Sequence, residues 1–330
     1  MLAATAVVTD FAAGRSVRSR MAVASRPLVP SRLAVAHSSK RRARTKFGAF
    51  VALTKPRIIE LLLVTTVPTM IVAAGGWPAW WLVALTLVGG TLAAASANTV
   101  NMVIDRDIDR VMRRTRERPL VTGEVTPTAA MVFAVALQSG SLLVLGLGVN
   151  VLSAVLALSA NAFYVGVYTL WLKRTSRQNI VIGGAAGAVP VLVGWAAVTG
   201  SLGWTPLVLF GIIFFWSPPH FWALAIKYVD DYRAANIPML PAVAEPRDTT
   251  RQMLIYTWVL VAVSLVLVPV AGLGLLYAGA AVVLGAGFLV CGYDLRRHLD
   301  PARSMRLFSY SISYLTLLFG ALAADVLVRS

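Results

Sequence analysis

The sequence predicts an all-α fold: a polytopic membrane bundle of nine transmembrane helices with a cytoplasmic N-terminus. The first observation is composition, because 58% of the 330 residues are hydrophobic and only 13% are charged, roughly half the charged fraction of a soluble domain. The second is that uncharged stretches of about 20 residues, enough to cross the hydrocarbon of a bilayer, recur along the chain. These stretches are too long for the short alternating strands of a membrane barrel.

Nine segments have the length and apolarity of a membrane span. They are residues 57–75, 79–104, 127–146, 150–172, 179–199, 204–226, 252–272, 275–293 and 305–326. The turns after the first, third, fifth and seventh spans carry no charge, whereas the alternate loops carry nearly all the charged residues of this region. Because basic loops remain in the cytoplasm, every charged loop is expected to face that compartment, and the C-terminus to lie outside.

Residues 1–46 form a basic arm ahead of the membrane domain, which we place at residues 47–330. The arm holds ten Lys or Arg residues and one acid, Asp10, and it lacks the apolar core of a secretory signal peptide. Two interpretations remain open: a disordered arm attracted to anionic lipid headgroups, and an Arg- and Ser-rich organelle transit peptide. A start site closer to Met21 would also explain the extra length.

The end of the second span carries amide and acidic side chains at helical spacing. The offsets are 0, 3, 7 and 11 residues for Asn98, Asn101, Asp105 and Asp109. This spacing places all four within about 80° of one another on one helix face, while Asp107 points to the opposite side. Polar groups at this depth normally face a bundle interior or a cavity, so we expect this face to line one.

Oxygen ligands of this kind suit Mg²⁺, which binds a few carboxylates together with phosphate oxygens and water. The arginines that follow, including Arg116 and Arg118, can fork onto the phosphate oxygens of a ligand. The pattern therefore predicts a diphosphate pocket at the membrane surface. The alternative is a frayed helix end whose carboxylates pair with neighbouring arginines, which would require no common helix face.

The sixth span ends with a similar stripe. His220, Lys227 and Asp231 lie at offsets of 0, 7 and 11 residues, so Asp231 is a candidate metal ligand and Lys227 a candidate diphosphate contact. Pro218 and Pro219 precede them and are expected to break or kink the helix, which then restarts. Three roles stay open for His220: a hydrogen-bonded interior residue, a contact to a planar and partly polar substrate, or an acid or base.

Two further basic groups face the same side of the membrane. Lys173 and Arg174 close the fourth span and are expected at the rim of the pocket. Lys55 opens the first span, where it is either a positive anchor at the membrane surface or a substrate contact.

Several motifs resemble a known family. The spacing of Asn101, Asp105 and Asp109 resembles the first signature of the UbiA-type intramembrane prenyltransferases. Six segments taken together resemble most closely the protoheme IX farnesyltransferase (haem O synthase) branch of this family. They are LTKPR, ANTVNMVIDRDIDRVMRRTRERPLVTG, YTLWLKR, QNIVIGGAAGAVPVLVGWAAVTG, FFWSPPHFWALA and DDYRAANIPMLPAV. One departure is Asn236, where that branch usually has Gly. Asn tolerates a left-handed backbone, so the turn is expected to survive.

The resemblance implies transfer of a farnesyl group from farnesyl diphosphate to a vinyl group of haem B, with water, giving haem O and diphosphate. It implies a Mg²⁺ cofactor, a lipid environment, haem A synthase as a candidate downstream partner, and no nucleic acid. It also implies the cell's inner or plasma membrane with the site facing the cytoplasm, or the inner mitochondrial membrane if the arm is a transit peptide.

The resemblance and the positions in the sequence together give candidate roles to individual residues. The metal ligands would be Asn101, Asp105, Asp109 and Asp231; the diphosphate contacts Asn101, Arg116, Arg118, Lys173 and Arg174; the catalytic set Asp105, Asp109, Lys227 and Asp231; and the haem contact His220.

Two other functions stay open. A UbiA-type enzyme could prenylate another aromatic or quinone-precursor acceptor, and assays with haem B and with 4-hydroxybenzoate would separate the two. A transporter would need polar residues at the centre of its spans, whereas the polar stripes here lie at the ends.

Overall fold

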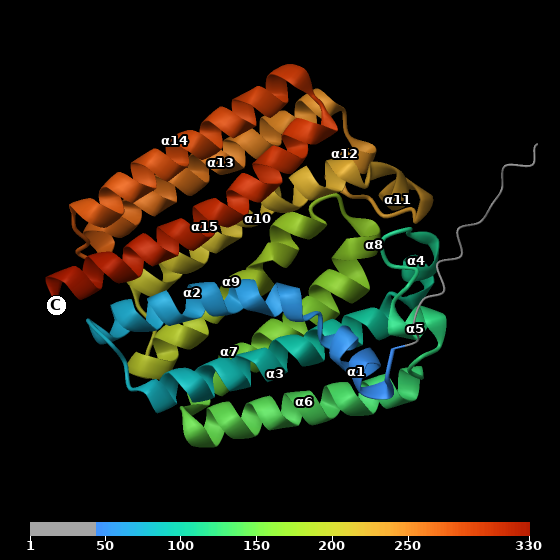
Figure 1. Ribbon diagram of the computed structural model, residues 1–330, viewed down its shortest axis with the longest axis horizontal. Helices are drawn as coiled ribbons and strands as arrows, with labels where there is room; N and C mark the ends of the chain where they lie inside the picture. The colour runs from blue at the N-terminus through green and yellow to red at the C-terminus, as the bar shows by residue number, and fades with distance from the viewer. Residues whose placement is uncertain (1–43) are drawn as a thin grey trace, which may run out of the picture. The chain divides into compact units, whose positions relative to one another are not determined.

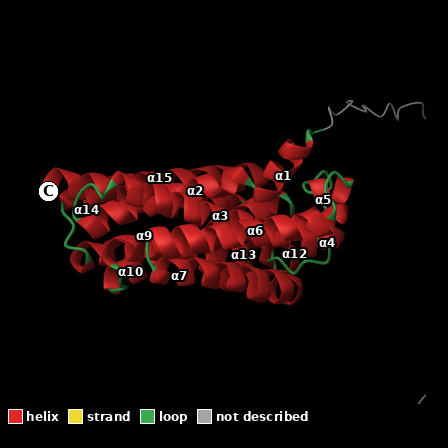
Figure 2. Ribbon diagram, turned by 90° about the horizontal axis from the view of Figure 1, so that it is seen from below, coloured by secondary structure: helices red, strands yellow, loops and turns green. Residues whose placement is uncertain are grey.

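The computed structural model describes residues 44–330, and for residues 57–63 it describes the backbone alone. Its long helices run side by side (Figures 1 and 2), and the described residues include no strand. The predicted basic arm lies outside the described residues apart from its last three. Its boundary with the membrane domain therefore stays a prediction.

Each predicted span is a helix in the described part of the chain. These helices are α2 (Pro56–Ala74), α3 (Trp80–Ile104), α6 (Pro127–Gly148), α7 (Val151–Ala162) continued by η1 (Phe163–Leu172) and α8 (Lys173–Thr175), α9 (Asn179–Thr199), α10 (Trp204–Lys227), α13 (Pro246–Val270), α14 (Leu275–His298) and α15 (Pro301–Arg329). Among the described residues, eight meet the length and hydropathy of a membrane span, and α2 adds the shorter apolar stretch Val64–Ala74. The predicted all-α membrane fold is confirmed, while the orientation of the N-terminus stays a prediction.

Short helices gather at one end of the bundle. Besides α8 they are α1 (Lys46–Thr54), α4 (Arg106–Val111), α5 (Pro119–Thr122), α11 (Val229–Ala234) and α12 (Leu240–Val243). Figure 1 shows them at the end opposite the C-terminus. At that other end the connections are tight: Gly75 (φ 65°) and Gly200 (φ 66°) adopt the left-handed conformation that commonly ends a helix. The charged loops predicted from the sequence thus meet at one polar end.

The packing differs between the two parts of the bundle. The largest fully buried side chains include Trp222, Tyr277, Phe288, Tyr314 and Phe319, which fill the space among α10, α14 and α15. Helices α3, α7 and α9 instead present small residues to one another, among them Ala93, Ala97, Ala157, Gly183 and Gly187. Small side chains leave space between helices, and the cavity described below lies there.

Two local features depart from the predictions. Helix α10 runs from Trp204 to Lys227 through Pro218 and Pro219, so the predicted restart of this helix is wrong. Packing against α9, α13 and α15 supports a continuous helix despite the missing N–H groups, and the predicted kink stays a prediction. The fourth span is also not uniform, because η1 is a π-helix of 10 residues.

The turn at Asn236 forms as expected. Its φ of 53° is left-handed, a conformation that Asn adopts more readily than most residues other than Gly. The substitution noted in the sequence is therefore compatible with the loop between α11 and α12.

Candidate active site

A cavity of about 330 Å³ lies inside the bundle and reaches its polar end. The charged residues that line it are Lys55, Asp109, Arg114, Arg118 and Lys173. Deeper in the bundle its wall consists mainly of small residues on α3, α7 and α9, among them Gly90, Ala94, Ala97, Ala160, Gly184 and Gly187. The cavity therefore has a charged end and an apolar body.

The predicted acidic face is buried. The exposed fractions are 6% for Asn98, 3% for Asn101, 0% for Asp105 and 2% for Asp109, whereas the side chain of Asp107 is 65% exposed. Although α3 ends before Asp105, the Asp109 amide donates to the Asp105 carbonyl (2.8 Å), so the helical phase continues into α4. The common face expected from the spacing is present.

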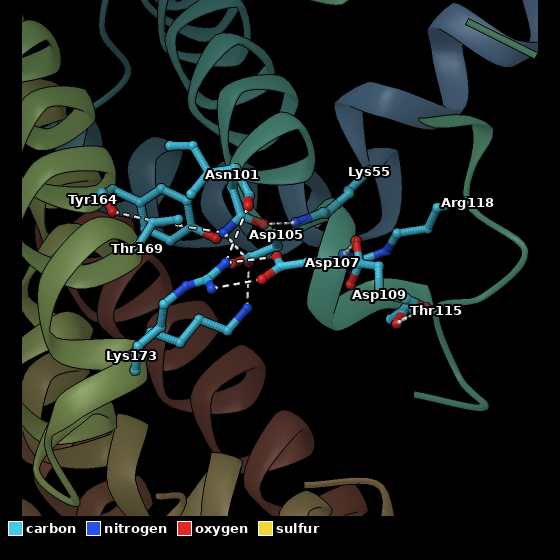
Figure 3. A network of polar contacts seen from close by, with 12 residues as sticks. Lys55, Asn101, Asp105, Asp107, Asp109, Thr115, Arg118, Tyr164, Thr169 and Lys173 are labelled. Atoms are coloured by element: carbon cyan, nitrogen blue, oxygen red, sulfur yellow. Dashed lines mark hydrogen bonds and ion pairs between the residues drawn. The ribbon is translucent and has the colours of Figure 1, made fainter. Parts of the chain in front are cut away.

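A polar network converges on Asp105 (Figure 3). Its Oδ2 accepts a hydrogen bond from Asn101 Nδ2 (2.7 Å) and forms an ion pair with Lys173 Nζ. Asn101 Nδ2 also donates to Thr169 Oγ1 (3.1 Å), and Asn101 Oδ1 accepts from Lys55 Nζ (2.9 Å). Residues from two other segments of the chain, Lys55 and the stretch from Thr169 to Lys173, therefore fix the positions of Asn101 and Asp105.

The π-helix η1 supplies one side of this network. Thr169 lies within it, Lys173 follows it directly, and Tyr164 and Tyr168 line the cavity from the same segment. Thr169 Oγ1 donates to the carbonyl of Tyr164 (2.9 Å). Wide π turns often occur at functional sites, and this one carries the side chains that reach Asn101 and Asp105.

Asp109 is held by a second ion pair. Its Oδ2 lies 2.6 Å from Arg118 Nη1, and its carbonyl accepts from Thr115 Oγ1 (3.2 Å). Both partners come from the loop between α4 and α5, which therefore folds back over α4. Arg118 lines the cavity, as the sequence predicted for a diphosphate contact.

Asp231 comes close to the same loop from the other half of the chain. Its side chain is mostly buried (8% exposed), and Oδ2 accepts from the backbone amide of Arg114 (3.3 Å). The Arg114 guanidinium and Lys227 Nζ each lie 5.6 Å from the centre of the Tyr228 ring. The structure thus joins Asp231 to the loop after α4, but it leaves Lys227 exposed and outside the cavity wall.

Arg174 is placed differently from its neighbour Lys173. Its guanidinium binds both carboxylate oxygens of Asp107 (2.8 and 2.7 Å) and donates to the carbonyl of Ile104 (3.1 Å) at the end of α3. This hydrogen bonding lowers the pKa of Asp107 to about 2. Arg116 is exposed, and neither arginine lines the cavity. Their predicted diphosphate contacts therefore stay predictions.

His220 is an interior residue in this structure. Its Nδ1 lies 2.7 Å from Ser311 Oγ, and its ring stacks between Trp216 and Phe308, with centroids 4.1 and 4.6 Å away. It does not line the cavity. The arrangement matches the hydrogen-bonded interior role left open by the sequence, and a haem contact stays a prediction.

Lys55 is the cavity residue that sequence reasoning left between two roles. It adopts a left-handed backbone (φ 53°) directly before α2, and its ammonium reaches Asn101 rather than the surface. Burial lowers its pKa, and the positive charges of Arg118 and Lys173 lower it further. The feature of the sequence that could have indicated this position is the dipeptide Lys55-Pro56, because Pro56 begins α2.

The charges of the cavity suit an anionic ligand that brings a cation. Four basic side chains line it against one carboxylate, Asp109, with Asp105 immediately behind. In the described part of the chain, no three His, Cys, Asp or Glu residues are grouped so as to hold a metal by themselves. However, Asp105 Oδ1 is buried without a hydrogen-bond partner, and Arg174 Nη2 lies 3.8 Å away. Such an oxygen fits a Mg²⁺ ion whose other ligands are phosphate oxygens and water.

The class of the protein follows from its fold, a bundle of membrane helices, and from its site, a buried cluster of acidic and basic side chains at one end of the bundle. A model of the UbiA prenyltransferase family matches residues 62–319, so the chain belongs to the UbiA prenyltransferase family. Within that family it is 56% identical over 286 residues to a protoheme IX farnesyltransferase of Frankia alni, covering 86% of this chain and 99% of the relative. A protoheme IX farnesyltransferase of Clavibacter sepedonicus is 55% identical, covering 86% and 94%.

Solved structures share the fold. A UbiA homolog from Aeropyrum pernix K1 superposes with a TM-score of 0.66 at 20% identity, covering 81% of this chain and 96% of that chain. A UbiA homolog from Archaeoglobus fulgidus bound to DMAPP and Mg²⁺ gives a TM-score of 0.58 at 16% identity, covering 82% and 99%. These structures confirm the fold, and the family match and the relatives above confirm the resemblance of the sequence motifs.

Proposed function

We propose that the chain transfers the farnesyl group of farnesyl diphosphate to a vinyl group of haem B, with addition of water, giving haem O and diphosphate. The observation that carries the proposal is the cavity, which has four basic side chains and the carboxylate of Asp109 at one end and mainly small apolar residues along its body. A substrate with a diphosphate head and a hydrocarbon tail matches both parts. Relatives more than half identical in sequence carry the name protoheme IX farnesyltransferase.

The basic residues would bind the diphosphate. Lys55, Arg118 and Lys173 line the cavity and already form hydrogen bonds or ion pairs with Asn101, Asp109 and Asp105 respectively, so they are held in place before substrate arrives. Donors positioned where negative charge grows stabilise the leaving group.

Asn101, Asp105, Asp109 and Asp231 are the residues that would hold Mg²⁺. When bound, the ion would neutralise charge on the diphosphate oxygens. A structure of the same fold, the Archaeoglobus fulgidus homolog bound to DMAPP and Mg²⁺, supports Mg²⁺ as the metal, whereas the choice of these four residues rests on their positions in this chain. Arg116, Arg174 and Lys227, outside the cavity wall, would attract the acidic groups of the two substrates towards its entrance.

The apolar body would hold the farnesyl chain. Along α3, Gly90 lies eleven residues before Asn101, about 16 Å deeper at the rise of an α-helix, which matches the length of an extended farnesyl chain. A wall consisting mainly of small and apolar residues keeps bulk water from an allylic cation. A nucleophile then reaches the cation only where the enzyme places it.

Product analysis tests the proposal directly. The purified protein, supplied with Mg²⁺, farnesyl diphosphate and haem B, should form haem O, detected by mass. A parallel reaction with 4-hydroxybenzoate tests the alternative acceptor class. Prenylation of the benzoate without any haem O would overturn the choice of haem as acceptor.

We also propose that the polar end faces the cytoplasm of a cell with this enzyme in its plasma membrane. The basic loops at that end support this orientation. A cysteine introduced at Gly203 should react with an impermeant reagent from outside, and one at Thr122 only after the membrane is opened. Labelling of the Thr122 position in intact cells would contradict the orientation.

A further inference from the structure

A second polar cluster lies inside the bundle, where α3, α6 and α7 meet. The Nδ2 group of Asn161 donates to Oε1 of Gln138 and to Oγ of Ser96 (3.2 Å). Ser96 Oγ in turn donates to the carbonyl of Ala134 (2.8 Å). Amide side chains within a membrane span are expensive to bury, and they commonly mark a functional position.

Asn161 lines the cavity on a wall that otherwise consists largely of Ala and Gly. An amide has two N–H hydrogens and one oxygen acceptor. Asn161 uses both hydrogens on Gln138 and Ser96, and its Oδ1 receives no hydrogen bond from the described residues. The hydrogen bonds therefore fix the amide so that an acceptor remains for a molecule in the cavity.

Tyr164 provides a second polar group beside Asn161. It lies three residues further along the same span, at the start of η1, and also lines the cavity. Its hydroxyl forms no hydrogen bond with the described residues. A water molecule needs two or more polar partners to be held in a protein interior, and these two side chains supply them.

The depth of this pair fits the reaction. Ser96, which contacts Asn161, lies five residues before Asn101 on α3, about 7.5 Å further from the polar end. A diphosphate held at Asn101, Arg118 and Lys173 would place farnesyl C1 just below those residues. The vinyl carbon that takes up oxygen is two carbon–carbon bonds from C1, which brings it towards the level of Asn161.

We propose that Asn161, oriented by Gln138 and Ser96 and assisted by Tyr164, binds the water molecule that is added to the haem vinyl group. This inference rests on the proposed function and deepens it, because it assigns residues to the third substrate. The hydrogen bonds of Asn161 to Gln138 and Ser96 do not explain why this amide lines the cavity, whereas binding of water near the carbocation does.

Each bond that breaks in the proposed step is matched by a bond that forms. The bond between farnesyl C1 and the diphosphate oxygen breaks, and its electron pair leaves with the diphosphate. The vinyl π pair forms the new carbon–carbon bond, which leaves positive charge on the inner vinyl carbon. A lone pair of the bound water forms the carbon–oxygen bond there, and the proton passes through further water to the released diphosphate. If no water is held, the cation loses a proton instead and gives an alkene lighter by one water.

The test is the mass of the farnesylated porphyrin made in water enriched in heavy oxygen. Wild-type protein should give haem O that carries the heavy oxygen. Asn161→Leu should still transfer farnesyl, but the hydroxylated fraction of its product should fall by about tenfold or more, with the dehydrated alkene in its place.

Two further variants separate this role from a structural one. Gln138→Met removes the group that orients Asn161 without touching the cavity wall, so it should also yield the alkene. Ser141→Ala is the matched control, since Ser141 Oγ donates to the carbonyl of Gly89 (2.8 Å) and links α6 to α3 outside the cavity. Its product should be hydroxylated as in the wild type.

If Asn161→Leu fails to fold, Gln138→Met decides the question. Hydroxylated product in the wild-type proportion from every folded variant would overturn the role of Asn161 while leaving farnesyl transfer intact. Absence of any farnesylated porphyrin from the wild-type protein would instead overturn the proposed function, and this inference with it.

Discussion

Replacing Lys173 by Met tests how the acidic and basic groups of the cavity depend on one another. Met keeps the length of the side chain and removes its charge. Asp105 is fully buried (0% exposed) and pairs with Lys173, whose side chain is 15% exposed, so the variant leaves a buried carboxylate with Asn101 as its hydrogen-bond donor. Removing one partner of a buried pair destabilises a protein by roughly 3–5 kcal/mol, and the partial exposure of Lys173 favours the lower value.

Mg²⁺ should restore part of this loss, because a cation at Asp105 replaces the missing ammonium and a ligand stabilises the state that binds it. Thermal unfolding of the solubilised protein, with Mg²⁺ or with a chelator, should show a larger Mg²⁺-dependent shift for Lys173→Met than for wild type. Farnesyl transfer should nevertheless fall by about 10²–10³ through the loss of one charge-stabilising donor. Arg177→Met, at an exposed position of the same loop, is the control. Equal Mg²⁺ shifts in wild type and Lys173→Met would refute Asp105 as a ligand.

Asp105→Asn and Asp109→Asn should each reduce the single-turnover rate by about 10³ or more, whereas Asp107→Asn should stay within about tenfold; equal losses in all three would contradict the assigned helix face. The pKa of Asp107 is lowered from 3.8 to about 2 in the folded state, so its stabilising contribution is complete above pH 3.8 and disappears as the pH falls through about 2. The difference in unfolding midpoint between wild type and Asp107→Asn should therefore vanish below pH 2, and its persistence there would exclude the pairing with Arg174. A Cβ at Gly90 meets no atom within 4 Å, so Gly90→Leu should fold normally but raise the KM for farnesyl diphosphate about tenfold more than the KM for geranyl diphosphate. An equal effect on both substrates would place the farnesyl tail elsewhere.

The spans could be predicted because crossing the hydrocarbon of a bilayer sets a requirement on consecutive residues, which the sequence shows directly. Roughly 20 apolar residues must be consecutive, and the predicted range 179–199 coincides with α9. Hydropathy does not locate the ends of helices that continue beyond the membrane. Helix α13 thus begins at Pro246, six residues before the predicted span, because the charged residues in between are helical as well. Helix α1 was not predicted, since nine residues are too few for a span.

The acidic half of the candidate site could be predicted because its members share one helix face, and helical phase follows from spacing alone. The basic half depends on contacts between distant segments. Lys173 and Arg174 are adjacent, yet one reaches Asp105 and the other Asp107, a difference of 100° about the helix axis that no charge pattern reveals. Lys55 reaches the cavity through a left-handed backbone (φ 53°), which depends on how α1 and α2 each pack against α3.

The pairing of acids with bases also bears on how the proposed substrates enter. In this structure Asp105 and Asp109 are neutralised by Lys173 and Arg118. A free Mg²⁺ ion would therefore meet carboxylates whose charge is already balanced, and a free diphosphate would have to draw the two bases away from buried carboxylates. Either step alone leaves one charge without a partner, which is costly in a buried site. A magnesium diphosphate supplies both partners together: the cation goes to the carboxylates and the phosphate oxygens go to the bases. In the proposed function the metal and the diphosphate therefore bind cooperatively, and the coupling comes from ion pairs that exchange partners rather than from any movement of the helices.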